Sequence, residues 1–560
     1  MANPWDKNSI APEALSRRQV LFAASLGLLV AGGVLFLVRH NFPYFNKNSV
    51  DGYYYATLAK NLVDGRGYTI GGLPHVVFHP LYPLLVSLFY LISSNLEWAA
   101  FLVNLLSLAL SGILAYAFFK LIFKRRDLSL WGMLFVLFSP DLLRYGSLMV
   151  TEVTYCAALL ALLYLTLRIT DERQPNREWL FYGLWGLNAG AAYLIKPESI
   201  GYLLALGVFL ALRQGNLKSI KYLGAAAVVV MFCCLPWMLY QARYYGSFVF
   251  SGKSAINLEV GALRGRDPQI NVARIFNAPL PDGSGVAWEK PYRMARRTSL
   301  ADNFAAYPAH LRRHLGYFCG LLGGGAFLFL LGLLHFYRRE RRLLWFVGLL
   351  MAVQLVIPFY FSEPRFIVPL IPLLLAAEFA GGLQLAAAAD WLATRLNRRP
   401  INASLLLAFI LLAVIAPWYF YQYPKIFRLN PTSREYHLLL QEYARAVVQE
   451  HPEIKEQPIV SYRPWFAYYA GAEHREMPYY TAPGPLIEYM RRNRLSYLLL
   501  SNVSQNDLSL NYRELGKNPS ARGLETIYDR KDFRLLKLTS LLQSPASGLR
   551  PPVCLVTRAF

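Results

Sequence analysis

Ionisable residues interrupt apolar stretches at a few points in this chain, and their types are those of acid–base chemistry. Asp51 opens the segment Asp-Gly-Tyr-Tyr-Tyr, and Glu152 stands directly before a long apolar run. Lys196 and Glu198 flank a proline between two apolar runs, and Arg365 follows Ser-Glu-Pro. An acid can take a proton from a nucleophile, and cations can hold a phosphate leaving group. The set indicates chemistry on a substrate that carries an anionic group.

Each of these residues also has an ordinary structural explanation. Asp51 can cap the helix that the spacing of Tyr55, Leu58, Ala59 and Leu62 predicts. Glu152 can complement the N-terminus of the helix that follows it. A Lys-Pro-Glu turn can be an ion pair whose charged ends reach toward the membrane surface. The functional interpretation rests on these residues meeting at one place.

The sequence predicts no cofactor and no metal centre. His75 and His79 are four residues apart and could, with nearby acids, hold a divalent metal as the alternative. Prolines at 74 and 80 flank this pair, so the two imidazoles are not expected on one helical face. The five cysteines form no CxxC pair, and neither a phosphate-binding glycine loop nor a zinc-protease motif is present.

The elements that must position these residues are membrane helices. Of the 560 residues, 55% are hydrophobic and 16% are charged, whereas a soluble domain carries about 25% charged residues. Stretches of roughly 20 apolar residues can cross a bilayer. Six clear candidates are Val20–Val38, Trp98–Phe119, Tyr222–Tyr240, Leu315–Tyr337, Leu343–Phe361 and Ile401–Tyr423. Five shorter ones are Leu128–Ser139, Val153–Leu167, Trp179–Ile195, Ser199–Leu212 and Phe366–Leu385, and we expect about 11–13 transmembrane helices in all.

Many of the basic residues that give the net charge of +23 lie in the loops between the predicted spans. If the first helix runs outward, five basic loops fall on the cytoplasmic side, as expected for a membrane protein rather than a nucleic-acid-binding one. This requires that His79–Ser93 be an interfacial or re-entrant helix. The sequence then predicts a multi-pass protein of the inner (plasma) membrane with a cytoplasmic N-terminus. Outer loops cover 39–97 and 242–314.

The composition changes after the last span, so residues 1–423 and 424–560 are predicted as separate domains. In the tail, Ser433–Gln449 has helical spacing, Pro458–Tyr462 and Ser496–Leu500 have strand patterns, and Pro485–Arg494 is a helix between them. Leu524–Tyr528 and Phe533–Leu538 predict a hairpin. A small extracytoplasmic α/β domain is expected.

Ordered motifs over the first two thirds of the chain resemble those of the GT-C glycosyltransferases, in particular the protein mannosyltransferase-like and aminoarabinose-transferase-like branch (glycosyltransferase families 39 and 83). The motifs are Asp51-Gly-Tyr-Tyr-Tyr, Ala59-x-Asn61-Leu62, Gly65-x-Gly67-Tyr68, His79-Pro-Leu-Tyr-Pro-Leu-Leu85, Ser139-Pro140, Glu152-x-x-Tyr155, Leu194-Ile-Lys-Pro-Glu198, Pro236-Trp237, Tyr245-Gly246 and Arg365-Phe366-x-x-Pro369-x-x-Pro372. The resemblance implies an α-helical polytopic membrane protein of GT-C fold.

The resemblance also implies a function and a site. The function is transfer of a sugar, a hexose or pentose, from a polyprenyl-phosphate donor to a lipid, glycan or protein on the extracytoplasmic face. Asp51 and Glu152 match catalytic acids, and Lys196 and His79 match positions that meet the carrier phosphate. Further donor- or substrate-binding residues are expected at Glu198, Arg144, Arg365, Tyr54 and Tyr82. Many relatives have a second acid after the first, where this chain has Gly52, so Asp51 acts either alone or with Glu152.

Two other functions remain open. A transporter or flippase for a lipid-linked glycan should show charges at the bilayer midplane, whereas the polar residues noted deep in the spans are the neutral Asn104, Asn188 and Gln354. A structural protein would not need acids and cations at one face. The basic loop 242–314, with Arg296 and Arg297, lies either on anionic lipid or at the entrance for an anionic acceptor.

Overall fold

The computed structural model describes residues 17–41, 50–171, 178–215, 217–267, 273–294, 298–360, 362–396, 403–427, 431–480, 482–501, 512–530 and 533–539. The chain divides into two compact units. The helical unit comprises residues 1–276 and 287–440, and the sheet unit comprises 277–286 and 441–560. The division at 440/441 differs from the predicted domain boundary at 423/424. Arg296 and Arg297 lie outside the described residues.

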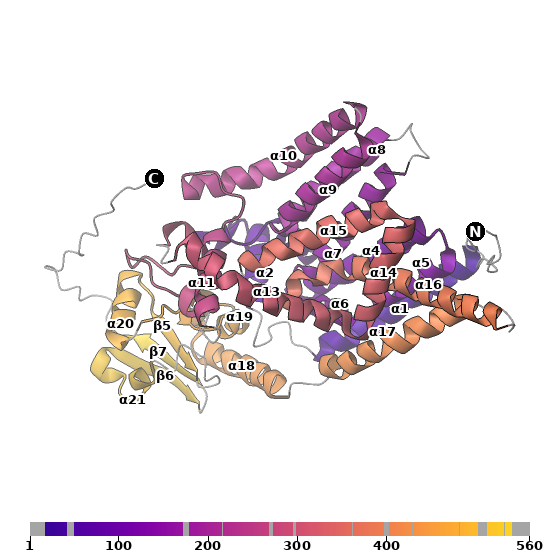
Figure 1. Ribbon diagram of the computed structural model, residues 1–560. Coiled ribbons are helices and arrows are strands. Elements are labelled where there is room, and N and C mark those ends of the chain that lie inside the picture. Colours follow the sequence, from indigo (N-terminus) through magenta and orange to yellow (C-terminus); the bar gives the residue numbers. More distant parts are fainter. Residues whose placement is uncertain are drawn as a thin grey trace. The chain divides into compact units, whose positions relative to one another are not determined.

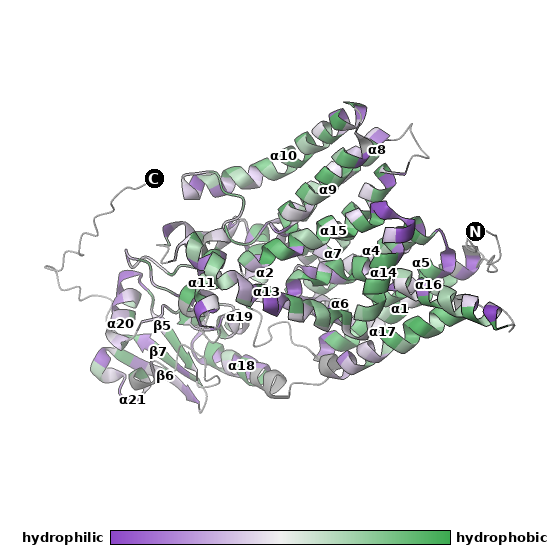
Figure 2. Ribbon diagram, viewed as in Figure 1, coloured by the Kyte–Doolittle hydropathy of each residue, from purple (hydrophilic) through white to green (hydrophobic). Residues whose placement is uncertain are grey.

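The helical unit is built from apolar helices (Figures 1 and 2). Its long helices are α1 (Arg17–Asn41), α4 (Leu96–Phe123), α7 (Glu152–Ile169), α8 (Glu178–Ile195), α9 (Ser199–Gln214), α10 (Leu217–Tyr245), α13 (Leu300–Leu322), α14 (Ala326–Arg339), α15 (Arg341–Val356), α16 (Ile371–Arg395) and α17 (Ala403–Phe427). Shorter ones are α2 (Asp51–Val63), α3 (Leu81–Ser93), α5 (Arg126–Leu137), α6 (Pro140–Gly146), α11 (Ser254–Arg266) and α12 (Ala273–Phe276).

Within the described residues, eight helical segments are long and apolar enough to cross a membrane, and α3 and most of α9 are shorter apolar helices. Each of the eleven predicted spans coincides with one or two helices. The expectation of a short helix over His79–Ser93 is met by the 13-residue α3. The figure of 11–13 crossings stays a prediction, since α5, α8 and α9 do not meet the length and hydropathy of the other spans.

The predicted span Leu315–Tyr337 is broken in two. Residues Gly323–Gly325 form a 3-10 turn between α13 and α14, and Gly323 has φ +53°, in the left-handed region that glycine adopts without strain. Beyond the break, α14 packs closely against α16. A Cβ on Gly332 would come within 1.8 Å of the Ala377 carbonyl oxygen, and one on Gly381 within 1.9 Å of the Leu328 carbonyl oxygen. Paired glycines therefore permit this backbone contact.

A carboxyl side chain inside α16 was missed by the sequence interpretation. Glu378 is 3% exposed and lies in a span whose apolar window is 89% buried. The statement that polar residues deep in the spans are neutral is therefore wrong. The neutral ones satisfy backbone groups, for example Asn104, whose amide nitrogen donates to the Leu148 carbonyl oxygen, and Asn188, which donates to the Ala158 carbonyl oxygen at 2.8 Å.

The sheet unit contains a five-stranded mixed sheet of order β4-β3-β5-β7-β6 (Figure 1). The strands are β3 (Pro458–Ser461), β4 (Glu473–Glu476), β5 (Tyr497–Ser501), β6 (Leu524–Arg530) and β7 (Phe533–Leu538). The chain division falls within α18 (Pro431–Glu450), and α19 (Trp465–Ala470), α20 (Pro483–Arg492) and α21 (Arg513–Lys517) follow. The predicted strands, hairpin and helix between strands are all present, and β4 is an addition that pairs in parallel with β3. The small α/β fold of the tail is confirmed.

Residues 277–286 leave the helical unit and belong to the sheet unit. The Asn277 side-chain nitrogen donates to a Glu476 carboxylate oxygen at 2.9 Å and to the Met477 carbonyl oxygen at 2.9 Å. Asn493 donates to the Gly283 carbonyl oxygen at 3.0 Å. The residues on either side of this segment belong to the helical unit, and there the Trp288 N–H donates to the Phe276 carbonyl oxygen at 2.9 Å.

Candidate active site

A cavity in the helical unit gathers most of the predicted chemistry. It holds about 540 Å³ of empty space, part of it open to solvent. Its walls come from α2, the segment before α3, the start of α7, the turn between α8 and α9, α11 and the segment before α16. The lining residues with polar side chains are Asp51, Tyr55, His79, Thr151, Glu152, Lys196, Glu198, Lys253, Asn257 and Arg365. Residues separated by three hundred positions thus meet at one place.

Asp51 and Arg365 form the centre of the site. Asp51 is the first residue of α2, and Arg365 lies in the 3-10 turn Pro364–Phe366. Arg365 Nη1 donates to Asp51 Oδ2 at 2.6 Å, and its Nε lies 2.8 Å from Glu363 Oε2. Burial acts to raise the pKa of Asp51, but the charges of Arg365, Lys253 and Lys196 outweigh it and hold this pKa below its usual value. Asp51 is therefore ionised at neutral pH.

Glu152 and Lys196 form a second, buried pair. Lys196 Nζ donates to Glu152 Oε1 at 3.0 Å, and the Glu152 side chain is 1% exposed. Arg365 Nη1 lies 4.0 Å from the same oxygen, which connects this pair to Asp51. Burying a charge is expensive unless an opposite charge compensates it. Here each buried acid of the network has a cation beside it.

The two histidines make separate contacts. His79 Nδ1 lies 2.7 Å from the Tyr193 carbonyl oxygen and donates to it, so its buried Nε2 is an acceptor without a hydrogen-bond partner. Burial lowers the pKa of His79 to about 4, so this imidazole is neutral. His75 Nε2 accepts the Phe78 N–H at 3.1 Å. Within the described residues, no group of three or more His, Cys, Asp or Glu side chains could hold a metal ion.

Three residues predicted for substrate binding lie outside the cavity lining. Arg144 sits on α6 and faces the Tyr145 ring. Tyr54 packs on Phe78 and Trp288, with ring centroids 5.7 Å apart in both cases. Tyr82 donates to Asn104 and packs its ring on Tyr55, the neighbour that does line the cavity. On a helix, adjacent residues face different directions, so Tyr55 rather than Tyr54 points to the site.

Lys253 and Asn257 line the cavity and were not predicted. Lys253 directly precedes α11, and Asn257 lies one turn into it. Gly252 brings this segment close to the first part of the chain, since a Cβ there would lie 2.0 Å from the Val76 carbonyl oxygen. A glycine followed by a lysine within a basic loop is the only signal in the sequence, and a loop of this length does not reveal which wall it joins.

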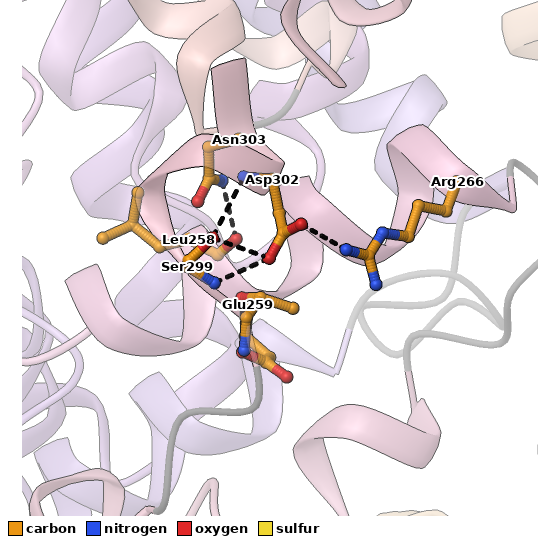
Figure 3. Close-up of polar contacts among 7 residues, drawn as sticks. Leu258, Glu259, Arg266, Ser299, Asp302 and Asn303 are labelled. Atoms are coloured by element: carbon orange, nitrogen blue, oxygen red, sulfur yellow. Dashed lines mark hydrogen bonds and ion pairs between the residues drawn. The ribbon is translucent and has the colours of Figure 1, made fainter. Parts of the chain in front are cut away.

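Helix α11 is held in place by α13. The Ser299 hydroxyl and the Asp302 carboxylate form a capping box at the start of α13, and Arg266 of α11 reaches the same carboxylate (Figure 3). The Asn303 side-chain nitrogen donates to the Leu258 carbonyl oxygen at 2.8 Å (Figure 3). The Thr298 hydroxyl donates to Glu259 Oε2 at 2.7 Å. These bonds fix the helix that carries Asn257 and follows Lys253.

A buried polar network supports the segment that carries Arg365. His314 of α13 contacts Ser362 Oγ at 3.0 Å through Nδ1 and Gln354 Oε1 at 2.8 Å through Nε2. The Gln354 side-chain nitrogen donates to the Tyr202 hydroxyl and to the Phe366 carbonyl oxygen. Residues on both sides of Arg365 are thereby hydrogen-bonded to α13 and α15. Gln354, which stood out in the sequence as a polar residue within a span, has this positioning role.

Comparison with known proteins agrees with this architecture. Residues 76–240 match the family model described as dolichyl-phosphate-mannose-protein mannosyltransferase. No curated protein sequence matches significantly. The structure of ArnT from Cupriavidus metallidurans bound to undecaprenyl phosphate is similar at a TM-score of 0.60 and 14% identity, over 94% of this chain and 99% of that one. An oligosaccharyltransferase from Archaeoglobus fulgidus, crystallised with zinc and sulfate, is similar at a TM-score of 0.52 and 15% identity, over 85% of this chain and 68% of that one.

Proposed function

We propose that this chain, which has the GT-C fold of membrane glycosyltransferases, transfers a sugar from a polyprenyl-phosphate donor to a hydroxyl or amine of a lipid, glycan or protein. The observation that carries the proposal is the cavity in which Asp51 meets Arg365, with Glu152 and Lys196 beside them. A base and several cations in one partly enclosed space suit a reaction with a proton to remove and a phosphate to release. The matching family model and the undecaprenyl-phosphate complex of ArnT support the donor class.

In this mechanism Asp51 is the general base. Its carboxylate takes the proton of the acceptor atom as that atom attacks the anomeric carbon, and the carrier phosphate leaves with the bonding electrons. Attack from the side opposite the phosphate inverts the anomeric centre. Arg365 donates to Asp51 Oδ2 at 2.6 Å. The second carboxylate oxygen, Oδ1, can receive the acceptor hydrogen while this ion pair persists.

The test replaces Asp51 by Asn, which keeps the shape and removes the basic oxygen. Transfer of labelled sugar from a polyprenyl-phosphate donor should fall by about 10²–10⁴-fold, while binding of undecaprenyl phosphate persists. Asp64→Asn is the matched control, because Asp64 follows the last residue of the same helix and is absent from the cavity lining. Glu152→Gln should cost less if Glu152 orients the acceptor. Full turnover by both Asp51→Asn and Glu152→Gln would refute the assignment.

The orientation in the membrane belongs to the same proposal. Five basic loops between the spans support an orientation with the N-terminus in the cytoplasm, and with the site and the sheet unit on the other face of the inner membrane. Single cysteines at the exposed positions Lys218 and Arg522, in a cysteine-free background, test it. A membrane-impermeant maleimide added to intact cells should label only Arg522→Cys. Labelling of Lys218→Cys alone would show that the chain has the opposite orientation in the membrane.

A transporter of a lipid-linked glycan is the second candidate, and Glu378 is the observation in its favour, because charged groups within spans mark transport pathways. Proteoliposomes distinguish the two functions. Movement of a lipid-linked glycan between leaflets without any acceptor, unchanged by Asp51→Asn, would support transport. Acceptor-dependent sugar transfer that Asp51→Asn abolishes would support the glycosyltransferase.

A further inference from the structure

The cations of the cavity differ in how well they are neutralised. Arg365 has Asp51, Glu363 and Glu152 within 4.0 Å. Lys196 has Glu152 at 3.0 Å. Lys253 has no carboxylate within 4.0 Å among the residues that the structure describes, although it lines the same cavity. Its charge reaches Asp51 and Glu198 only at longer range.

The surroundings of Lys253 are aromatic. Its Nζ lies 5.6 Å from the centre of the Phe78 ring and 5.3 Å from that of Trp288. Rings attract the ammonium group but do not neutralise it. They also displace water, so an anion that reaches Lys253 meets a positive charge with little solvent around it.

We propose that Lys253, rather than Lys196, is the main anchor of the anionic phosphate of the donor. This inference rests on the proposed function and assigns the donor-binding part of the same site. A phosphate near Lys196 or Arg365 would also approach the carboxylates that these cations already neutralise, and repulsion would offset much of the attraction. Near Lys253 it gains an uncompensated ammonium group. Lys196 is then the counter-ion of Glu152, 3.0 Å away.

Asn257, on α11, is the second residue of the proposed donor-binding part of the site. Its side chain lines the cavity one helical turn beyond Lys253, and its Oδ1 is buried without a hydrogen-bond partner. A buried acceptor without a donor lowers stability until a ligand supplies one. A hydroxyl of the donor sugar is such a group. Lys253 thus recognises the phosphate, and Asn257 the sugar attached to it.

Binding of two lipids, undecaprenyl phosphate and the uncharged undecaprenol, tests the role of Lys253 on the purified full chain. Lys253→Met should weaken undecaprenyl phosphate binding at least tenfold and leave undecaprenol binding unchanged, and Lys253→Arg should restore much of the loss. Lys196→Met, if its melting temperature shows it folded, should weaken phosphate binding less than threefold. Lys60→Met on α2, outside the cavity lining, is the control.

Equal binding of undecaprenyl phosphate by wild type and Lys253→Met would overturn the inference, as would a larger loss in a folded Lys196→Met. The proposed function fails in a different way. If the wild type binds undecaprenyl phosphate through Lys253 but transfers no sugar from any polyprenyl-phosphate sugar, the anchor stands and the transferase assignment falls. If it transfers sugar and Lys253→Met binds normally, only the anchor is wrong.

Asn257→Ala tests the sugar contact. It should weaken binding of a polyprenyl-phosphate sugar about tenfold and leave binding of sugar-free undecaprenyl phosphate unchanged. Asn257→Asp keeps an acceptor oxygen and should retain more of the sugar-dependent affinity than Asn257→Ala. An equal loss for both lipids, or no loss for either, would contradict a contact to the sugar.

Discussion

Two cavities of the helical unit hold carboxyl groups in different settings. In the candidate active site, Asp51 and Glu152 each contact a cation. In a second cavity, lined by parts of α6, α13, α16 and α17, Glu378 and Asp141 are present, but no lysine or arginine is among the lining residues that the structure describes. Within the described residues, Glu378 has no hydrogen bond or ion pair. A Cβ on Gly325 would lie 2.3 Å from Glu378 Oε1, so a glycine makes room for this carboxyl group.

The difference shows how location determines what an acid can do. The paired acids stand at or near helix starts, where separate segments bring cations to them, and an ionised base needs such neighbours in a dry site. Glu378 lies inside a helix that is packed on most sides, so neutralisation by a cation would require another charged residue within the spans. A carboxyl group in that setting is suited to a proton rather than to a permanent charge.

Removal of the cation beside Glu152 should have the largest effect on stability. Lys196→Met leaves a side chain that is 1% exposed without its nearest cation, and breaking such a pair costs about 3–5 kcal/mol. We expect a large fall in the melting temperature, read by tryptophan fluorescence in detergent. Lys196→Met combined with Glu152→Gln should recover part of the loss, because no charge is left unpaired. A single variant as stable as wild type would show that Arg365 alone suffices.

Arg365→Gln tests the charge on Asp51. Arg365 opposes the effect of burial on the pKa of Asp51, so this pKa should rise when the guanidinium is removed. The reaction needs ionised Asp51, so the acidic limb of the kcat/KM profile should move to higher pH, and the rate at neutral pH should fall about 10²-fold. Arg144→Gln, outside the cavity lining, should leave the profile unchanged. An unshifted limb in Arg365→Gln would assign the acidic limb to another group.

Gln354→Leu tests the support behind Arg365. It removes the bonds to His314 and to the Phe366 carbonyl oxygen and should lower kcat about tenfold through a misplaced guanidinium. The acidic limb should move slightly in the direction seen for Arg365→Gln. Asn188→Leu, on α8 and bonded to the Ala158 carbonyl oxygen, is a control for removing an amide from a span. A loss of stability with an unchanged kcat would make the network purely structural.

Glu378→Gln should have the smallest effect. The amide has nearly the shape of a protonated carboxyl group, so turnover should change less than about threefold and stability by less than about 1 kcal/mol. Both are measured beside Asp51→Asn in the same proteoliposomes. A loss of activity as large as that of Asp51→Asn would mean that the second cavity takes part in function and that the contrast between the two cavities is false.

The sequence predicts the helices and the tail well because hydrophobic period and turn residues are local signals. It also predicts Asp51, Glu152, Lys196 and Arg365, since charged residues at the ends of apolar runs are conspicuous. It does not predict Lys253 or Asn257, whose place depends on the path of a long loop. It misses Glu378 because a single acid does not change the apolar character of the run around it. It selects Tyr54 in place of Tyr55 because three consecutive tyrosines do not show which of them the helix turns toward the cavity.

The excursion at residues 277–286 has a consequence for the order of assembly. Asn277 bonds to Glu476 and Met477, which are synthesised long after it. The nascent chain must therefore keep this segment available while α13 to α17 are made and inserted. Released alone, residues 441–560 would lack the hydrogen bonds that Asn277 supplies to Glu476 and Met477. Removing the tail would in turn leave residues 277–286 without their partners in the middle of the chain.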